Sequence, residues 1–239
     1  MEFQRDGGVA RIFLNRPQKV NALNSATLDA LVAILAKVDE NVRVLVLGGH
    51  GAAFCGGADV NELAKLDPDS AREFVGRIHR VCATLRALPV PVVARLHGAV
   101  IGAGLEIAAA CDLRVAARGT RFAMPEVKLG IPSVVEAALL PRLMGSGRAA
   151  WLVLTGEPID AERAYEWGLV ESLCAASDLD QTVAGVVQSL LAADRAALRA
   201  QKELLQLWDE QPLAASIAAS IERFAQAYTI GRAKAPKEY

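Results

Sequence analysis

The chain has 239 residues, of which 53% are hydrophobic and 22% charged, and its formal net charge is −1. This composition suits one large domain with a well-buried core and excludes disorder. The near-neutral charge argues against a nucleic-acid partner, because phosphate neutralisation needs a concentrated basic surface. No window approaches the roughly 18 uninterrupted apolar residues of a membrane span, and the charged, glycine-containing start does not resemble a signal peptide. We therefore expect a cytoplasmic protein with no membrane partner.

The four cysteines, Cys55, Cys82, Cys111 and Cys174, show neither CxxC nor metal-ligand spacing. Such spacing is the usual signal of a redox or zinc site. We therefore expect buried free thiols, no disulfide and no bound metal.

Strands and helices alternate in the first half of the chain. Apolar runs predict strands at residues 9–14, 42–47, 92–94 and 113–116. Apolar residues at helical spacing predict a helix from Ser25 to Val38, and an alanine-rich helix is expected to end at Ala110. This order of strand, turn, helix and strand predicts an α/β fold whose sheet is covered by helices.

From residue 133 onward the pattern becomes helical. Ser146 and Asp160 are predicted helix N-caps, and Gly168 is the predicted stop of a helix over residues 161–167. Residues 181–228 predict two or three helices without strands. The chain is therefore expected to form a core followed by a helical C-terminal extension.

Two glycine-containing turns follow strand-like segments, at residues 54–59 and 101–106. Glycine lets the backbone approach a ligand closely, and a helix that begins at such a turn presents unpaired N–H groups. Two such donors directed at one oxygen would form an oxyanion hole. Glycine turns after strands also occur without any ligand, and neither turn matches the phosphate-binding GxxxxGK[ST] or GxGxxG patterns.

Six motifs in the order of the chain resemble the enoyl-CoA hydratase/isomerase family, the crotonases. They are Asn-Arg-Pro at 15–17 with Val-Asn-Ala-Leu-Asn at 20–24, Phe-Cys-Gly-Gly-Ala-Asp at 54–59, Gly-Ala-Gly-Leu-Glu at 102–106, Pro-Glu-Val-Lys-Leu-Gly at 125–130, Leu-Thr-Gly-Glu-Pro-Ile at 154–159, and Ala-Glu at 161–162 leading to Trp-Gly-Leu-Val at 167–170. The resemblance implies a crotonase-type spiral of repeated ββα units over residues 1–180. It also implies a helical region over 181–239 that is used to assemble homotrimers or dimers of trimers.

The resemblance further implies an acyl-CoA thioester as substrate, with no cofactor beyond the coenzyme A that the substrate carries. The backbone N–H groups of Ala58 and Ala103 are expected to hold the thioester oxygen. Glu106 is expected to orient and deprotonate water, and Glu126 to exchange the proton on Cα. Further substrate contacts are expected from Gly57, Asp59, Val60, Gly102 and Gly104.

Each glutamate also has an interpretation without catalysis. Glu106 lies early in a helix, where a carboxylate interacts favourably with the helix dipole. Glu126 follows a proline and could be a surface carboxylate at a turn. The ordered motifs favour the catalytic interpretation of both.

The chain departs from the family pattern at three places. Ala103 stands where the family usually has glycine, so its φ must suit a residue with a Cβ. Residues 131–141 keep a proline but replace the usual glycines, which makes Pro132, Val134 and Glu136 candidates for the acyl pocket. Glu136 is either an exposed helix residue, as we expect, or a third carboxylate facing the substrate. The tail at 231–239 lacks the family's usual ending, which often helps to close the ligand site.

The expected function is reversible hydration of a 2-enoyl-CoA to a 3-hydroxyacyl-CoA. An enoyl-CoA isomerase is the closest alternative, because it needs one base and no activated water; another acyl-CoA lyase or dehydratase of the crotonase family is a further one. A non-catalytic acyl-CoA-binding or RNA-binding relative belongs to a different class; the intact glutamates and the near-neutral charge argue against it. A protease on a related spiral would need a serine where Ala58 and Ala103 stand. His50, His79, His97 and Cys55 rank below the glutamates as catalytic candidates. The pattern predicts neither the length nor the branching of the acyl chain.

Overall fold

The computed structural model describes residues 1–229. The last part of the predicted helical region, residues 230–239 with the unusual tail, lies outside the described residues. Within the described part, the main sheet has six strands in the order β1-β2-β3-β4-β6-β9. These are β1 (Glu2–Asp6), β2 (Val9–Leu14), β3 (Val44–Gly49), β4 (Val92–Leu96), β6 (Leu113–Ala117) and β9 (Ser172–Cys174). The β1–β2 hairpin is antiparallel and the remaining pairs are parallel.

A second, smaller sheet leads the chain to the candidate site. It contains β5 (Ala99–Ile101), β7 (Arg121–Ala123) and β8 (Ile159–Asp160). The chain passes from β4 into β5 at Gly98, where φ is +60° and a Cβ would overlap the Ala52 carbonyl oxygen. Only glycine suits both conditions, and the turn delivers Ile101 and Gly102 to the second glycine turn.

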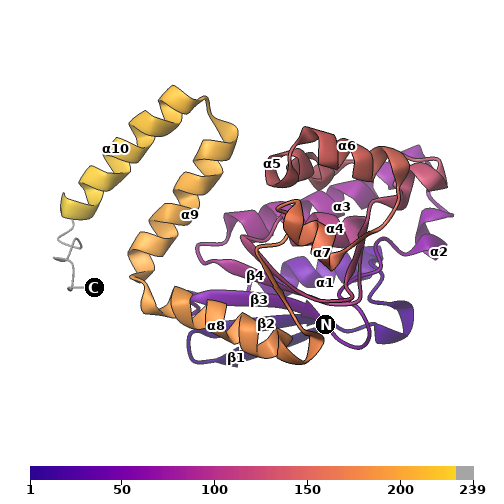
Figure 1. The fold of residues 1–239 in the computed structure, drawn as a ribbon, viewed down its shortest axis with the longest axis horizontal. Coiled ribbons are helices and arrows are strands. Elements are labelled where there is room, and N and C mark those ends of the chain that lie inside the picture. Colours follow the sequence, from indigo (N-terminus) through magenta and orange to yellow (C-terminus); the bar gives the residue numbers. More distant parts are fainter. Residues whose placement is uncertain (230–239) are drawn as a thin grey trace.

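Helices cover both faces of the main sheet (Figure 1). The larger core lies between the sheet and the helices α1 (Ser25–Leu35), α3 (Pro68–Ala87) and α4 (Ala103–Ala109). On the other face, α8 (Leu179–Ala192) packs Leu179, Val183 and Val187 against valines of β3, β4 and β6. The strands between these layers are apolar on both faces, which explains why β3 is a continuous apolar run.

Shorter elements complete the core. They are η1 (Pro17–Lys19), α2 (Val60–Leu63), η2 (Pro125–Leu129), η3 (Val135–Leu139), α5 (Leu140–Met144), α6 (Ser146–Thr155), α7 (Ala161–Glu166) and η4 (Ala176–Asp178), where η denotes a 3-10 helix. The 3-10 helix η3 packs beside α4, and η2 packs beside α6. They carry Glu136 and Glu126, which come after the second glycine turn in the chain.

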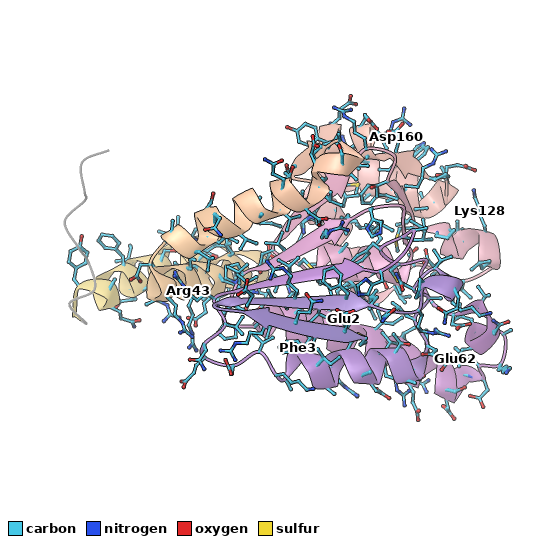
Figure 2. All side chains as sticks on the ribbon, turned by 90° about the horizontal axis from the view of Figure 1, so that it is seen from below. Glu2, Phe3, Arg43, Glu62, Lys128 and Asp160 are labelled. Carbon is cyan, nitrogen blue, oxygen red and sulfur yellow. The ribbon has the colours of Figure 1, made fainter. Side chains whose placement is uncertain are left out.

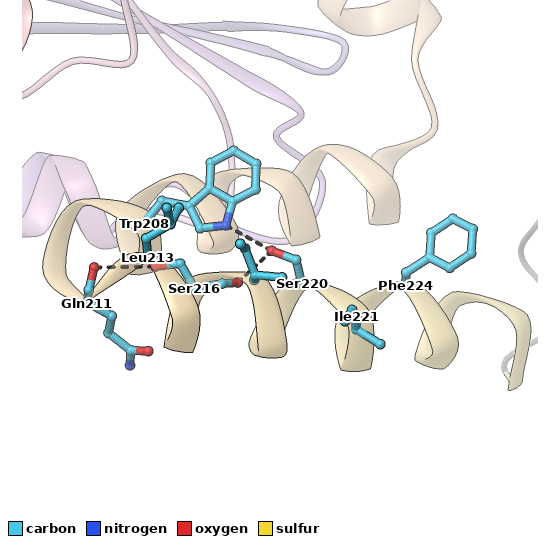
Figure 3. Close-up of a pocket in the computed structure, with 8 residues that line it drawn as sticks. Trp208, Gln211, Leu213, Ser216, Ser220, Ile221 and Phe224 are labelled. Carbon is cyan, nitrogen blue, oxygen red and sulfur yellow. Dashed lines mark hydrogen bonds between the residues drawn. The ribbon is translucent and has the colours of Figure 1, made fainter.

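The C-terminal helices α9 (Arg195–Glu210) and α10 (Leu213–Thr229) form a hairpin that extends away from the core (Figure 1). Lys202 anchors α9, because its buried Nζ lies 2.7 Å from Asp112 Oδ2 and donates to the carbonyls of Leu85 and Val90. The groove between the two helices is lined by Trp208, Leu213, Ile217, Ile221 and Phe224 (Figure 3). These large apolar side chains are exposed in the single chain.

Most predicted elements are confirmed. The strands and the helix from Ser25 form, although α1 ends at Leu35, before Val38. Asp160 caps α7, accepting a hydrogen bond from Arg163 N at 2.9 Å, and Gly168 follows that helix with φ +83°. The prediction for Ser146 is wrong: Gly145, with φ +85°, is the N-cap, and Ser146 is the first helical residue. Residues 181–228 hold parts of three helices, within the expected range.

The structure also bears on the predictions about the cysteines and about membrane-spanning helices. All four cysteines are free; Cys55, Cys82 and Cys111 are buried, and Cys174 is half-buried. Within residues 1–229, no helix is both long and apolar enough to cross a membrane.

Candidate active site

The two glycine turns lie side by side. The Cys55 N–H donates to the Ala99 carbonyl at 2.9 Å, and the Ile101 N–H donates to the Cys55 carbonyl at 3.0 Å. A Cβ at Gly57 would lie 2.9 Å from the Ile101 oxygen, and one at Gly104 would lie 2.7 Å from Cys55 Cβ. Both distances are shorter than real Cβ contacts, so these glycines are what allows the turns to pack together.

The peptide of Ala58 is fixed by its neighbours. The Leu23 N–H donates to the Gly57 carbonyl, and the Asp59 N–H donates to the Leu23 carbonyl, both at 2.8 Å. Within residues 1–229, the N–H of Ala58 itself has no acceptor. Ala58 therefore presents a free backbone donor that is held in place on both sides.

Ala103 presents a second donor. It is the first residue of α4, where a backbone N–H has no acceptor inside the helix. Ala103 has an ordinary helical conformation, and the positive φ of this turn, +51°, falls on Gly102. Alanine is therefore compatible with the position at which the family usually has glycine.

A cavity of about 670 Å³ opens beside the two turns. Its lining includes Val60 of α2 and Glu126 of η2. Figure 2 shows Glu62 of α2 and Lys128 of η2 at the end of the molecule opposite the α9–α10 hairpin. Both glutamates line it, as do Gly57, Ala58, Val60, Gly102, Ala103, Pro132 and Val134 among the predicted residues. Asp59, Gly104 and Glu136 are not among its lining residues in the described part of the chain.

Asp59 has structural contacts instead. Its carboxylate caps α2 by accepting from the Asn61 N–H at 3.1 Å, and it pairs with Arg16 Nη2 at 3.1 Å. Burial acts to raise the pKa of Asp59, but the hydrogen bonds from Arg16 and Asn61 outweigh it, and the net pKa is lowered. This pair joins the Asn-Arg-Pro motif to the first turn.

Glu106 projects from the first turn of α4 and is 4% exposed. Burial raises its pKa to about 8, and the nearby carboxylates of Glu126 and Glu136 act in the same direction. A hydrogen bond from the Ala137 N–H opposes this shift by favouring the charged form. Glu106 is thus a carboxyl group that can hold a proton near neutral pH.

Glu126, in η2, is held against the second turn. A Cβ at Gly102 would collide with Glu126 Oε1, so the glycine leaves the space that this oxygen needs. The Ser133 hydroxyl donates to the other oxygen, Oε2, at 2.9 Å. Ser133 was not predicted, because nothing in the local pattern indicates which way its hydroxyl points.

Glu136 is buried, at 8% exposed, so the expectation that it is an exposed helix residue is wrong. Its Oε1 lies 2.8 Å from Nδ1 of His79 on α3. The reason is local: η3 begins at Val135 with φ +41°, an unusual value for a β-branched residue, and Glu136 packs toward α3 and α4 instead of solvent.

One wall of the cavity was not predicted. It comes from α2, the following loop and α3, and its apolar residues are Leu63, Leu66, Phe74, Val75 and Ile78. The signal was present in the sequence, since Asp67 and Ser70 form a capping box around Pro68 at the start of α3. Phe74, Ile78, Val81 and Leu85 then follow at helical spacing.

The lower-ranked candidates lie outside the cavity lining. His97 hydrogen-bonds the Gly51 carbonyl at 3.0 Å, and burial lowers its pKa. His50 pairs with Glu2 at 2.6 Å. Burial raises the pKa of the Cys55 thiol to about 12, so it is no nucleophile at neutral pH. Among the described residues, no group of three or more His, Cys, Asp and Glu could hold a metal ion.

The chain as a whole matches known proteins in sequence and in fold. The family model for enoyl-CoA hydratase/isomerase matches residues 4–235. The chain belongs to this family.

Individual relatives agree with this assignment. The chain is 39% identical over 226 residues to YngF of Bacillus subtilis, named as an enoyl-CoA hydratase/isomerase, covering 93% of this chain and 86% of the relative. It is 31% identical over 230 residues to the short-chain-enoyl-CoA hydratase of Clostridium acetobutylicum, covering 95% and 88%. The crystal structure of the enoyl-CoA hydratase from Bacillus anthracis superposes with a TM-score of 0.89 at 30% identity, covering 99% of this chain and 98% of that chain. The predicted crotonase fold is thereby confirmed.

Proposed function

We propose that this chain is an enoyl-CoA hydratase that adds water reversibly to a 2-enoyl-CoA and forms a 3-hydroxyacyl-CoA. The observation that carries the proposal is the placement of Glu106 and Glu126 on one cavity, beside the free N–H groups of Ala58 and Ala103. Hydration needs these two kinds of group together: a pair of proton-transfer groups and a site for negative charge on the thioester oxygen.

The proposed oxyanion hole consists of the N–H groups of Ala58 and Ala103. When water adds to Cβ, the electrons of the C=C bond move toward Cα and the thioester oxygen, and enolate-like charge develops on that oxygen. Fixed amides need no reorganisation to stabilise this charge, and one such donor contributes about 3 kcal/mol to transition-state stabilisation. The neighbouring residues Gly57, Val60 and Gly102 would contact the thioester.

The two glutamates divide the proton transfers. Glu106 accepts a proton from water as its oxygen bonds to Cβ, and Glu126 donates a proton to Cα. The reverse reaction uses the same groups in opposite roles, so either direction requires one proton shared by the pair. Glu106 has to be ionised to accept that proton, and because its pKa is raised to about 8, the ionised form is favoured above neutral pH. The step needs no redox or metal chemistry.

The apolar wall of α2 and α3, together with Pro132 and Val134, would surround the acyl chain. Such a lining favours an uncharged acyl group, because burying a charge without a partner is costly. Asp59 and Gly104 support the two turns, and we assign them that role instead of direct substrate contact.

We also propose that residues 1–180 form the catalytic core and that residues 181–239 assemble the chain into trimers or dimers of trimers. The exposed apolar groove of α9 and α10 supports this, since an isolated chain would leave it in water. Replacing Phe224 with Asp should convert the assembly to smaller species in sedimentation velocity. An Arg195→Ala variant, changed at the start of α9, is the control.

Changing Glu126 to Gln should lower turnover of crotonyl-CoA by about 10²- to 10⁴-fold, the usual contribution of a general acid or base. Glu62→Gln is a matched control, because Glu62 hydrogen-bonds Ser25 and does not line the cavity. If Glu126→Gln stayed near wild-type turnover on every enoyl-CoA tested, the two-carboxylate mechanism would be wrong.

An enoyl-CoA isomerase is the second candidate, and one observation favours it. Burial raises the pKa of Glu106 to about 8, so this group is largely protonated at pH 7 and cannot readily accept a proton from water. Glu126 alone could then move a proton between Cα and Cγ. The two activities differ in whether water enters the product.

A further inference from the structure

Glu136 occupies an unusual position for a charged residue. It is 8% exposed, and while Oε1 pairs with His79, Oε2 is buried without a hydrogen-bond partner in the described part of the chain. A buried carboxylate oxygen without a partner destabilises the fold, and such groups call for a functional explanation. Glu136 is not a cavity-lining residue, so direct contact with the substrate does not supply one.

Glu136 is linked instead to Glu106. The next residue, Ala137, donates its N–H to the Val134 carbonyl at 3.0 Å, and the same N–H acts to lower the pKa of the Glu106 carboxyl group. The position of this N–H depends on how η3 is held, and the His79–Glu136 contact ties η3 to α3. The charge of Glu136 also acts on Glu106 directly, disfavouring its ionised form.

Within residues 1–229, the side chain that pairs with Glu136 is His79. From α3 it faces His79 and the Cys82 thiol, whose pKa is raised mainly by burial and also by Glu136; from α4 it faces Glu106. On the following helix, α5, Arg142 pairs with Asp209 of α9. The His79 side chain is 61% exposed, so it can be changed without opening a buried cavity.

We propose that Glu136 is a positioning residue which, held by His79, sets the orientation and charge state of Glu106. The inference rests on the proposed role of Glu106 as the group that activates water. Glu136 orders the turn whose N–H holds the Glu106 carboxylate, and its charge makes Glu106 a stronger base. The hydrogen bond between His79 and Glu136 partly offsets that charge.

The proposal predicts opposite effects from two variants. Glu136→Gln keeps the shape of the side chain but removes its charge. The acid limb of the plot of kcat/KM against pH should therefore move to lower pH by about 1 unit. At a fixed pH below the limb, this shift corresponds to about a tenfold larger fraction of ionised Glu106. His79→Ala leaves Glu136 uncompensated, so the limb should move up. The double variant should resemble Glu136→Gln, because His79 acts only through Glu136. KM should stay within about twofold throughout, since neither residue lines the cavity.

Arg80→Ala is the matched control, because Arg80 is an exposed α3 residue beside His79. A purely structural role would lower activity or stability without moving the limb in opposite directions. Identical limbs in wild type, Glu136→Gln and His79→Ala would overturn the proposal.

A second readout needs no substrate. Infrared titration of the free protein, with the Glu106 signal assigned by its loss in Glu106→Gln, reports the ionisation of that carboxyl group. If the Glu106 signal shifts in opposite directions in Glu136→Gln and His79→Ala, the positioning role is supported. If no hydration is detected at the same time, only the proposed hydratase function is wrong. Hydratase activity with an unshifted Glu106 signal overturns the positioning role alone.

Discussion

Gly102 offers the sharpest test of how the site is assembled. Its φ is +51° and its ψ is −123°, a combination that L side chains rarely adopt, and a Cβ there would collide with Glu126 Oε1. In Gly102→Ala the carboxylate oxygen has to retreat by about 1 Å, and a displacement of that size in an active site costs about 10²-fold in rate. The strained backbone should also lower the free energy of unfolding by about 1–3 kcal/mol.

The assay is a double-mutant cycle. The kcat and KM for crotonyl-CoA hydration are measured for wild type, Gly102→Ala, Glu126→Gln and the double variant, and thermal unfolding reports stability. If Gly102 acts through Glu126, its substitution should cost little further activity once Glu126 is Gln. Gly76→Ala, in α3 with no atom within 4 Å of the added Cβ, is the control for adding a methyl group. Wild-type kcat in Gly102→Ala, or fully additive losses in the double variant, would refute the reasoning.

Three further predictions concern the Ala103 donor, the ionisation of Glu106 and the accessibility of the cysteines. Ala103→Pro removes the proposed donor at the first position of α4, where proline suits the helix, so kcat should fall by about 10²- to 10³-fold while the melting temperature changes by only a few degrees. The pKa of Glu106 is raised from 4.5 to about 8, so between these pH values the folded protein holds a proton that the unfolded chain has released. The free energy of unfolding of the wild type therefore falls as pH rises through this window. Glu106→Gln should have a higher melting temperature than wild type at pH 8 but not at pH 4. A thiol reagent should modify Cys174 rapidly in the native protein and the other three cysteines only after unfolding, as mass spectrometry of labelled peptides would show, because those three are buried.

The sequence predicts the scaffold of the site well where local chemistry decides the structure. The apolar run at 42–47 predicts a strand covered on both faces, and β3 is such a strand. The glycines of both turns are needed for positive φ or close packing, and the structure has them in those roles. The resemblance assigned Glu106 and Glu126, and both line one cavity.

Prediction fails where distant packing decides. Glu136 is followed by the good helix formers Ala137, Ala138 and Leu139, and a glutamate on a helix is usually exposed. The positive φ at Val135 and the contact with His79 of α3 turn the carboxylate inward instead. Residues 79 and 136 are far apart in the chain, so no local pattern joins them. The short strands β5, β7, β8 and β9 were missed for a similar reason, because two or three residues are too few to show a period of two.

Ser146 shows a third kind of failure. Serine is a common N-cap, but here the preceding Gly145 occupies that position with φ +85°, a conformation for which glycine is better suited. Helix boundaries depend on the backbone as well as on capping side chains, and the glycine was the better signal.

The most direct test of the central claim is the mass of the product. Crotonyl-CoA and a 3-enoyl-CoA are incubated separately with the protein, and the products are followed by mass spectrometry, with Glu126→Gln as the control. The two-carboxylate account predicts that crotonyl-CoA gains the mass of one water and that Glu126→Gln forms this product at least a hundredfold more slowly. Unchanged mass with crotonyl-CoA, together with conversion of the 3-enoyl-CoA to an isomer of equal mass, would contradict it and identify an isomerase.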